Sequence, residues 1–422
     1  MITETVSSPR MDGEYLRVEH PSGLTLMLCP MKGFSGAYAL FSTRCGSIDD
    51  SFRTSPDQPF TRVPEGIAHF LEHKLFESEE GDAFEQYAKT GANANAFTSF
   101  DRTAYLFGCT DRFEESLEIL VNLVTHPYFT EQTVEKEQGI IAQEIRMYDD
   151  SPERRVFINL MNCLYKEYPL KYDVAGSAES VESITINDLL AAFGGFYKPS
   201  NMIIVCVGDI DPEETFKIAE KLLKKNNNPS AEKLFPQEVE EIAKDYHEEI
   251  TGISKPVFNL GFKEKNPSRG IDVKRFCGVK ILLEILFGKG SLFFERLYQR
   301  GILTEPLDFQ YLTGHDFSSA IIGGRSEDPL LVRDEIFKEL ETRLQVGIDR
   351  DSFVRVMKME SGRFIRGLDY PDSVFMSQIE LSVSGADIAD AFDAAVSIDR
   401  EYVENLMKEI LKEEKSALSV VK

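Results

Sequence analysis

The chain has 422 residues, with 47 basic and 71 acidic side chains, which give a formal net charge of −24. This acidic excess argues against nucleic acid or an anionic membrane as a partner, because both repel negative charge. The length exceeds what one compact core usually organises, so two domains are expected. The charge itself has two interpretations, an ordinary acidic surface or an acidic chamber that attracts basic peptides.

The sequence shows no signal for export or for a membrane. Its N-terminal stretch is polar and acidic, and it contains no apolar run of the ~18 residues that a membrane helix needs. The cysteines, at positions 29, 45, 109, 163, 206 and 277, are scattered without paired spacing. They predict reduced core cysteines of a cytoplasmic protein, and neither a disulfide framework nor a zinc knuckle.

The first predicted element with evident chemistry is a helix that follows Pro64 and Gly66. It carries the pattern H-x-x-E-H at His69, Glu72 and His73. Positions i, i+3 and i+4 share one face of a helix, so the two imidazoles could hold one metal beside the glutamate. This order inverts the commoner zinc motif and is typical of inverzincins. The alternative is a pair of hydrogen-bonded core histidines, although burying all three polar groups without partners is costly.

A run of glycine, alanine and asparagine then leads into β-favouring residues between positions 91 and 109. Small side chains there would let another backbone approach, so an extended peptide could add to the sheet edge at Asn95, Ala96 and Phe97. The alternative interpretation is simply a turn that enters a strand.

A long helix is predicted over residues 129–150, with Val134, Ile141 and Ile145 on its buried face. Glu137 and Glu144 lie two turns apart and border that face. Catalytic zinc usually has three protein ligands and a water, so one of these carboxylates is the candidate third ligand and the other its support. Spacing alone does not rank the two.

The polar segment around residues 226–240 predicts a linker between domains 1–225 and 241–422. The two halves look like distant repeats, because the order strand, helix, long helix recurs. The strand at 102–109 corresponds to 317–324, and the helix at 129–150 corresponds to the one at 351–368. Where the first half has Glu137 and Glu144, the second has Val356 and Arg363, so only the first half should hold metal.

The sequence resembles the pitrilysin or M16 metallopeptidases along nearly its whole length. The resemblance rests on four motifs in the family's order, which are HFLEHKLF (69–76), GANANAFTSFDRTAYLF (91–107), EKEQGIIAQEI (135–145) and FYKPSNMIIVCVGDI (196–210). It is strongest to a bacterial, two-domain subgroup similar to the processing peptidases. The fold it implies is α+β, with two homologous domains that each have a mostly antiparallel sheet and helices on one face.

The resemblance also assigns roles to residues. It implies one zinc ion per chain, bound by His69, His73 and Glu144, with Glu137 in support and Glu72 as the catalytic base. It further implies that Asn95 and Ala96 contact the backbone of a peptide substrate.

One departure from the family pattern concerns the second half. Active members carry an arginine and a tyrosine there that bind substrate, and Tyr298 and Thr304 stand at the matching positions. Family members with this loss act in heterodimers, where a partner supplies the missing pair. The alternative is that Arg296 or Arg300 substitutes.

The expected function is therefore zinc-dependent endopeptidase activity on peptides or short unfolded segments inside a chamber. The chain would act as a dimer, as the metal-bearing subunit of a heterodimer with a paralogue. The alternatives are a non-catalytic core or scaffold subunit, and a binding module in which zinc is only structural.

Overall fold

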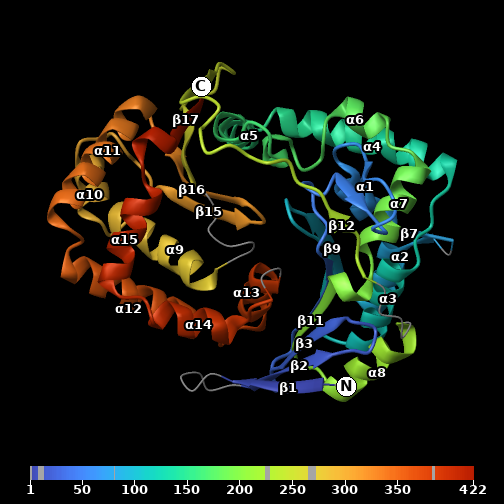
Figure 1. The fold of residues 1–422 in the computed structure, drawn as a ribbon. Helices are drawn as coiled ribbons and strands as arrows, with labels where there is room; N and C mark the ends of the chain where they lie inside the picture. The colour runs from blue at the N-terminus through green and yellow to red at the C-terminus, as the bar shows by residue number, and fades with distance from the viewer. Residues whose placement is uncertain (1, 8–13, 80, 224–228, 265–271, 383–384) are drawn as a thin grey trace. The chain divides into compact units, whose positions relative to one another are not determined.

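The computed structural model describes residues 2–7, 14–79, 81–223, 229–264, 272–382 and 385–422 (Figure 1). The chain forms two compact units, each built from more than one stretch of sequence. Unit 1 comprises residues 1–146, 173–235 and 367–389, and unit 2 comprises 147–172, 236–366 and 390–422.

Unit 1 is organised around a seven-stranded sheet with the order β1-β2-β3-β11-β4-β10-β9. The strands are β1 (Ile2–Ser7), β2 (Glu14–Glu19), β3 (Thr25–Pro30), β4 (Ala37–Thr43), β9 (Asn93–Thr98), β10 (Thr103–Cys109) and β11 (Met202–Gly208). Only β3 and β11 run parallel, and all other neighbours are antiparallel. Short strands form two further small sheets, namely β5 (Ser51–Arg53), β6 (Thr61–Arg62) and β12 (Glu232–Lys233), and β7 (Glu77–Ser78) with β8 (Gly81–Asp82).

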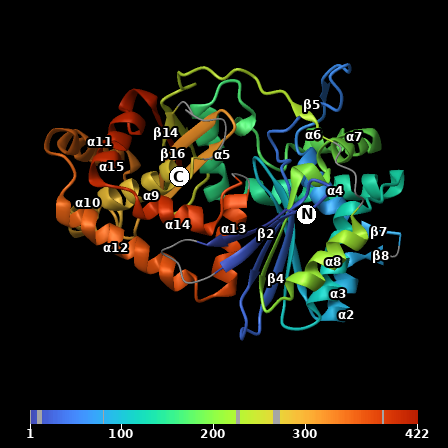
Figure 2. The same ribbon diagram turned by 60° about the horizontal axis from the view of Figure 1, so that its bottom comes forward.

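One face of this sheet packs against the main helical layer of unit 1. Figure 2 shows α3 and α8 alongside the strands. The helices of the unit are α1 (Ile67–Leu75), α2 (Ala83–Thr90), α3 (Phe113–Thr125), α4 (Glu131–Asp149), α6 (Ala178–Glu182), α7 (Ile186–Phe196), α8 (Pro212–Leu222) and α13 (Pro371–Ser382). Every residue of the central strand β11 is buried, because helices cover both of its faces.

The helix on the opposite face is α13, which comes from the C-terminal half of the chain and packs on β11 and β4. The Phe375 ring stacks on Tyr38 with centroids 5.4 Å apart. At the C-terminal end of α13, Arg102 Nη1 donates to the Ile379 carbonyl at 2.5 Å. Such a cation is favourable there, because the last carbonyls of a helix lack partners within it.

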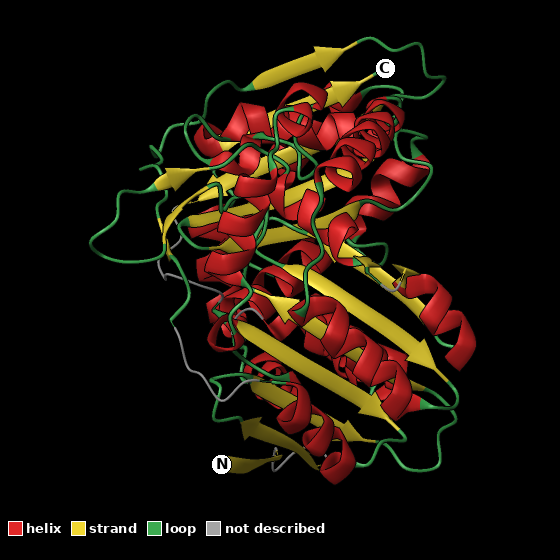
Figure 3. Cartoon of the chain, turned by 90° about the vertical axis from the view of Figure 1, so that its right-hand side faces the viewer, coloured by secondary structure: helices red, strands yellow, loops and turns green. Residues whose placement is uncertain are grey.

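Unit 2 repeats this architecture with a five-stranded sheet of order β13-β17-β14-β16-β15. Its strands are β13 (Tyr246–Glu249), β14 (Val257–Glu264), β15 (Asp308–Gly314), β16 (Phe317–Arg325) and β17 (Ser416–Val421). Its helices are α5 (Pro152–Leu164), α9 (Val273–Phe287), α10 (Leu292–Gln299), α11 (Pro329–Val346), α12 (Arg350–Gly367), α14 (Ile388–Val396) and α15 (Arg400–Ile410). Figure 3 shows helices (red) packed over the strands (yellow).

Unit 2 in turn holds a helix from the N-terminal half of the chain. Helix α5 packs on β17 and β14, and Asn159 Nδ2 donates to the Glu249 carboxylate at 2.8 Å, where Arg155 also pairs. Val156 of α5 lies in a small apolar cluster with Val257 and Val421.

Five of the seven strands in the unit 1 sheet match the five strands of the unit 2 sheet in order. The order β3-β11-β4-β10-β9 corresponds to β13-β17-β14-β16-β15, and in each the one parallel pair stands at the same place. The predicted repeat and the α+β fold of two homologous domains are therefore confirmed. The sequence predicted helices on one face of each sheet. The structure shows one further helix on the other face, and in each unit this helix comes from the opposite half of the chain.

The domain borders at 225 and 241 stay a prediction. Within the predicted linker 226–240, residues 226–228 lie outside the described residues. Of the remainder, Ala231 is buried in unit 1 and β12 pairs with β5, whereas the chain returns to unit 2 at Pro236.

All six cysteines are free thiols, and all except Cys277 are buried, as the sequence predicts. Over the described ranges, no helix combines the length and the apolar character that crossing a bilayer requires.

Candidate metal centre

Helix α1 presents the H-x-x-E-H pattern and begins where the sequence predicts. Gly66 precedes it with φ 86°, and a Cβ on this glycine would lie 2.4 Å from the Ala175 carbonyl oxygen. The position therefore admits only glycine. An apolar stripe at helical spacing, formed by Ile67, Phe70, Leu71 and Leu75, is buried in the core of unit 1. This packing fixes the rotation of α1 and leaves the two histidines on the neighbouring face.

The structure brings both histidines together with Glu144 of α4. The His69 and His73 ring centroids lie 4.7 Å apart. The Glu144 carboxylate approaches His69 Nε2 at 3.8 Å and His73 Nε2 at 3.3 Å. One ligand atom from each of the three residues lies within 4.8 Å of the other two. Two imidazole nitrogens and one carboxylate oxygen are a zinc donor set with room for a further ligand, so these residues fit the metal.

Glu137 lies behind this group, two turns before Glu144 on α4. Its Oε1 lies 2.9 Å from His73 Nδ1, and the residue is only 6% exposed. A carboxylate on the far nitrogen of an imidazole fixes the ring's orientation and directs Nε2 toward a metal. The geometry thus separates two glutamates that sequence spacing cannot rank, since Glu144 faces both Nε2 atoms and Glu137 the back of one ring.

The carboxylates also set the charge of His73. Burial alone would lower the pKa of this imidazole, but Glu137 and Glu144 outweigh it and raise the pKa to about 10. Two anionic groups thus converge on one imidazole, an arrangement that suits the binding of a cation.

Glu72 lies on α1 between the histidines but outside the three-residue group. It is 9% exposed, and its Oε2 accepts a hydrogen bond from the Thr98 hydroxyl at 2.6 Å. Burial raises the pKa of Glu72, which Thr98 and His73 partly offset. A buried carboxyl group of raised pKa, beside a metal-binding group but not part of it, is typical of a general base.

Thr98 ends β9, the edge strand that also carries Asn95, Ala96 and Phe97. In the sheet β9 pairs with β10 only, so its other edge has no neighbour among the described strands. Helix α1 packs against β9. The structure therefore places these three residues on an open sheet edge beside the candidate metal centre, which suits β-augmentation by an extended chain.

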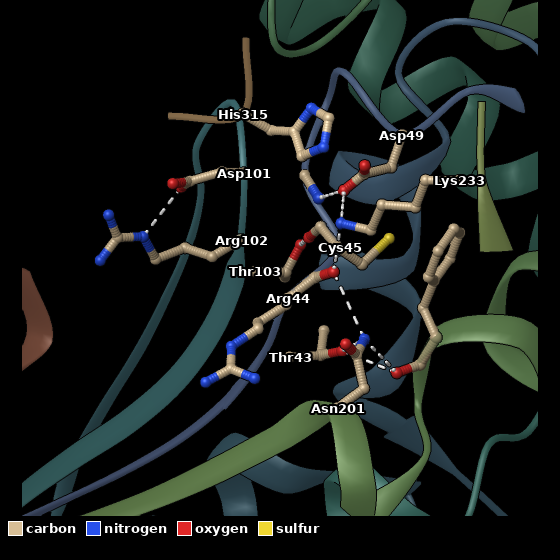
Figure 4. A network of polar contacts seen from close by, with 12 residues as sticks. Thr43, Arg44, Cys45, Asp49, Asp101, Arg102, Thr103, Asn201, Lys233 and His315 are labelled. Carbon is tan, nitrogen blue, oxygen red and sulfur yellow. Dashed lines mark hydrogen bonds and ion pairs between the residues drawn. The ribbon is translucent and has the colours of Figure 1, made fainter. Parts of the chain in front are cut away.

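The turn between β9 and β10 is held by the loop that follows β4 (Figure 4). The amides of Ser47 and Ile48 donate to the carbonyls of Ser99 and Phe100 at 3.0 and 3.1 Å. The Thr103 hydroxyl donates to the Cys45 carbonyl at 2.8 Å.

Lys233 fixes the same loop from its other side (Figure 4). Its Nζ donates to Asp49 Oδ2 at 2.9 Å and to the Arg44 carbonyl at 2.8 Å. Several hydrogen bonds thus hold the turn between β9 and β10 and the loop that follows β4.

Tyr298 and Thr304, which stand where the family has its arginine and tyrosine, belong to unit 2. The Tyr298 side chain is exposed, and Thr304 Oγ1 accepts from Lys255 at 2.6 Å.

The neighbouring arginines are engaged within unit 2. Arg296 pairs with Glu339 at 3.1 Å and Arg300 with Glu335 at 3.0 Å. Both glutamates are buried, at 5% and 6% exposure. Each of the two arginines thus has a carboxylate partner within unit 2.

Sequence reasoning assigned no role to Thr98 or Lys233, because each contacts a residue far away in the chain. For Thr98 the available signal was its place at the end of the small-residue run. Nothing in the local pattern marks Lys233.

Comparison with known proteins places the chain in a family. Residues 61–178 match the family described as Insulinase (Peptidase family M16), and residues 183–359 match the Peptidase M16 inactive domain. The chain belongs to the M16 peptidase family.

Among its relatives is an uncharacterized zinc protease, YmfH, of Bacillus subtilis, 38% identical over 395 residues and 92% of each chain. A probable mitochondrial-processing peptidase subunit beta of Schizosaccharomyces pombe is 33% identical over 202 residues, 47% of this chain and 43% of that one. A crystal structure of a putative M16-like peptidase from Alicyclobacillus acidocaldarius superimposes with a TM-score of 0.94 at 32% identity, covering 98% and 99% of the two chains.

Proposed function

We propose that this chain is a zinc-dependent endopeptidase, with His69, His73 and Glu144 as the metal ligands. The observation that carries the proposal is the convergence of three ligand atoms within 4.8 Å beside Glu72, a buried carboxylate outside that group. A structural zinc site would need no such added base and favours four Cys or His ligands. Relatives named as zinc proteases support the same function.

Zinc held there would act as a Lewis acid on the scissile carbonyl and on water. Glu137 fixes the His73 ring through Nδ1, which keeps Nε2 directed at the site. Glu72 accepts the proton of the attacking water on its carboxylate and passes it to the leaving amine nitrogen. Burial raises the pKa of Glu72, which makes its carboxylate a better proton acceptor than an exposed glutamate.

The substrate is an extended peptide or a short unfolded segment that pairs with the open edge of β9. Asn95, Ala96 and Phe97 contact it. The alternating exposure along the strand, with Asn93 and Asn95 outward, leaves the backbone accessible between small side chains. We propose that cleavage takes place inside a closed chamber.

The proposal includes a partner chain, a paralogue that supplies an arginine and a tyrosine to the site. It is supported by the ion pairs that engage Arg296 and Arg300 with buried Glu339 and Glu335. A relative named as the beta subunit of a processing peptidase is consistent with heterodimers in the family. A cytoplasmic location stays a prediction from the reduced cysteines.

The second candidate is a non-catalytic core subunit, which the match of residues 183–359 to an inactive domain favours. That match lies mostly outside the candidate metal centre, because His69, His73 and Glu144 all precede residue 183. The presence of a complete ligand set and base therefore favours the peptidase.

The test is hydrolysis of a mixed peptide library by the purified chain, with zinc content measured in parallel. We expect Glu72→Gln to retain zinc and to lose activity by at least ~100-fold, because it removes the base and no ligand. The matched control is Glu135→Gln, an exposed glutamate on α4, which should change neither.

Full turnover by Glu72→Gln would remove Glu72 as the base. If the zinc-loaded chain alone hydrolyses no peptide, the assay is repeated with a paralogue that lacks H-x-x-E-H. If the mixture hydrolyses no peptide either, the result favours the core subunit.

A further inference from the structure

The contact between Glu72 and Thr98 joins two elements that are separate in the chain. Glu72 lies on the helix α1 and Thr98 ends the edge strand β9, and the hydroxyl donates to Glu72 Oε2 at 2.6 Å. Hydrogen bonds from a hydroxyl to a carboxylate at this distance are charge-assisted and about twice as strong as neutral ones. The contact is buried beside a side chain that is 9% exposed, so little water competes for it.

Thr98 is itself held rigidly. Its backbone pairs with Thr103 across the β9–β10 ladder, and the two hydroxyls lie 3.5 Å apart. The Thr103 hydroxyl reaches on to the Cys45 carbonyl. The β-branched side chain of Thr98 has few χ1 rotamers, so fixing the strand also fixes the hydroxyl.

We propose that Thr98 is a positioning residue that sets the orientation of the Glu72 carboxylate and couples it to the peptide-binding strand. This inference rests on the proposed function. A carboxylate at the end of a glutamate side chain turns freely about its last torsion unless a partner holds one oxygen. With Oε2 held by Thr98, Oε1 is left to receive the proton of the attacking water.

The coupling follows from the place of Thr98 in the strand. It directly follows Phe97, so the backbone that would pair with substrate at Asn95–Phe97 continues into the residue that holds the base. The peptide-pairing backbone and the residue that orients the base therefore belong to one strand, so a peptide paired at Asn95–Phe97 meets a carboxylate that is already oriented.

The experiment compares three variants of the zinc-loaded protein. Thr98→Val keeps the shape and removes the hydroxyl, and Thr98→Ser restores it. The control Thr25→Val removes another threonine hydroxyl that donates to a glutamate, Glu19, on β3, which three strands separate from β9. We expect Thr98→Val to lower kcat by up to about 100-fold with KM and zinc content near wild type, because only orientation is lost. Thr98→Ser should recover most of kcat, and Thr25→Val should leave it unchanged.

A second measurement does not depend on turnover. High-resolution crystal structures of wild type and Thr98→Val should show the Glu72 carboxylate turned to a new position in the variant. If the carboxylate stays in place, or if Thr98→Val turns over at the wild-type rate, the inference is overturned. A loss of kcat that serine does not restore would also count against it.

Different results would overturn the proposed function and the role of Thr98. A wild-type protein without peptidase activity, alone or with a paralogue, would overturn the proposed function. The crystallographic position of Glu72 would still decide whether Thr98 orients it.

Discussion

Units 1 and 2 share a strand order but differ in what their long helices carry. In unit 1, α4 places Glu137 at 6% exposure behind His73, and Glu144 between two imidazoles. At the corresponding places on α12 of unit 2 are Val356, fully buried, and Arg363, which is largely exposed and pairs with Glu360. The fold therefore needs no carboxylate at either place.

This difference shows that the residues of the candidate metal centre are an addition to a strand order that unit 2 forms without them. A buried valine is the ordinary residue for such a position, whereas a buried glutamate costs free energy unless it is paired. Glu137 is retained in unit 1 at that cost because it orients a histidine. Function is thus located in a few residues on one copy of a repeated fold.

The largest expected effect comes from removing the charge at the matching positions of the two long helices. Glu144→Gln in unit 1 should weaken zinc affinity by at least ~100-fold, because it removes an anionic ligand. Arg363→Gln in unit 2 should leave zinc affinity unchanged. Competition with a chromophoric chelator measures both, and equal zinc binding by Glu144→Gln and wild type would remove Glu144 from the ligand set.

A second comparison uses two glycines beside the sheets. A Cβ on Gly46 of unit 1 would lie 2.4 Å from the backbone of Phe100 and Asp101, whereas one on Gly261 of unit 2 would meet only the side-chain tips of Leu160 and Leu164, at 2.9 and 2.8 Å. Backbone cannot yield as leucine tips can. Gly46→Ala should therefore cost about 3 kcal/mol of unfolding free energy and Gly261→Ala about 1 kcal/mol.

Urea unfolding of both glycine variants, read by circular dichroism, gives the two values. Equal costs would show that the β9–β10 turn adjusts as easily as the leucine side chains. A larger cost for Gly261→Ala would reverse the comparison.

The third comparison depends on pH and begins at Glu238, in the predicted linker. Glu238 accepts from Lys263 at 2.7 Å and from the amides of Lys166, Glu167 and Tyr168. Burial opposes the ionised form, but these partners outweigh it and hold the pKa of Glu238 below its usual value. A depressed pKa stabilises the fold above the unfolded pKa of about 4.3 and loses that effect as the pH falls through the folded value.

Glu238→Gln should therefore cost about 2 kcal/mol at pH 7, and this deficit should narrow below about pH 4. Asp49, which pairs with Lys233 in unit 1, gives the contrast, because burial raises its pKa. The deficit of Asp49→Asn should widen as the pH falls. Thermal unfolding across this pH range measures both, and parallel behaviour of the two variants would contradict the assigned pKa directions.

The sequence predicted those features that depend on local periodicity. The rotation of α1 and α4 follows from apolar spacing, so His69, His73, Glu137 and Glu144 could be placed on the correct faces. The repeat was visible for the same reason, because β10 and β16 and the helices after them have similar patterns.

Contacts between segments that lie far apart in the chain could not be predicted from the sequence. No local pattern states that Thr98 bonds Glu72, or that Glu335 and Glu339 hold Arg300 and Arg296. The exchanged helices were missed for a related reason. Amphipathic spacing shows that α5 and α13 bury one face, but it does not show against which sheet.

The helix α13 has a consequence for the genetics of this protein. Although it is encoded far downstream of every candidate metal ligand, it covers the β4 and β11 face of the unit that contains them. A premature stop codon after residue 366 would leave the ligand codons intact and yet strip that sheet of its cover. Nonsense and frameshift alleles late in the reading frame should therefore abolish the candidate metal centre. We expect them to be as severe as alleles that delete the codons for His69, His73 and Glu144.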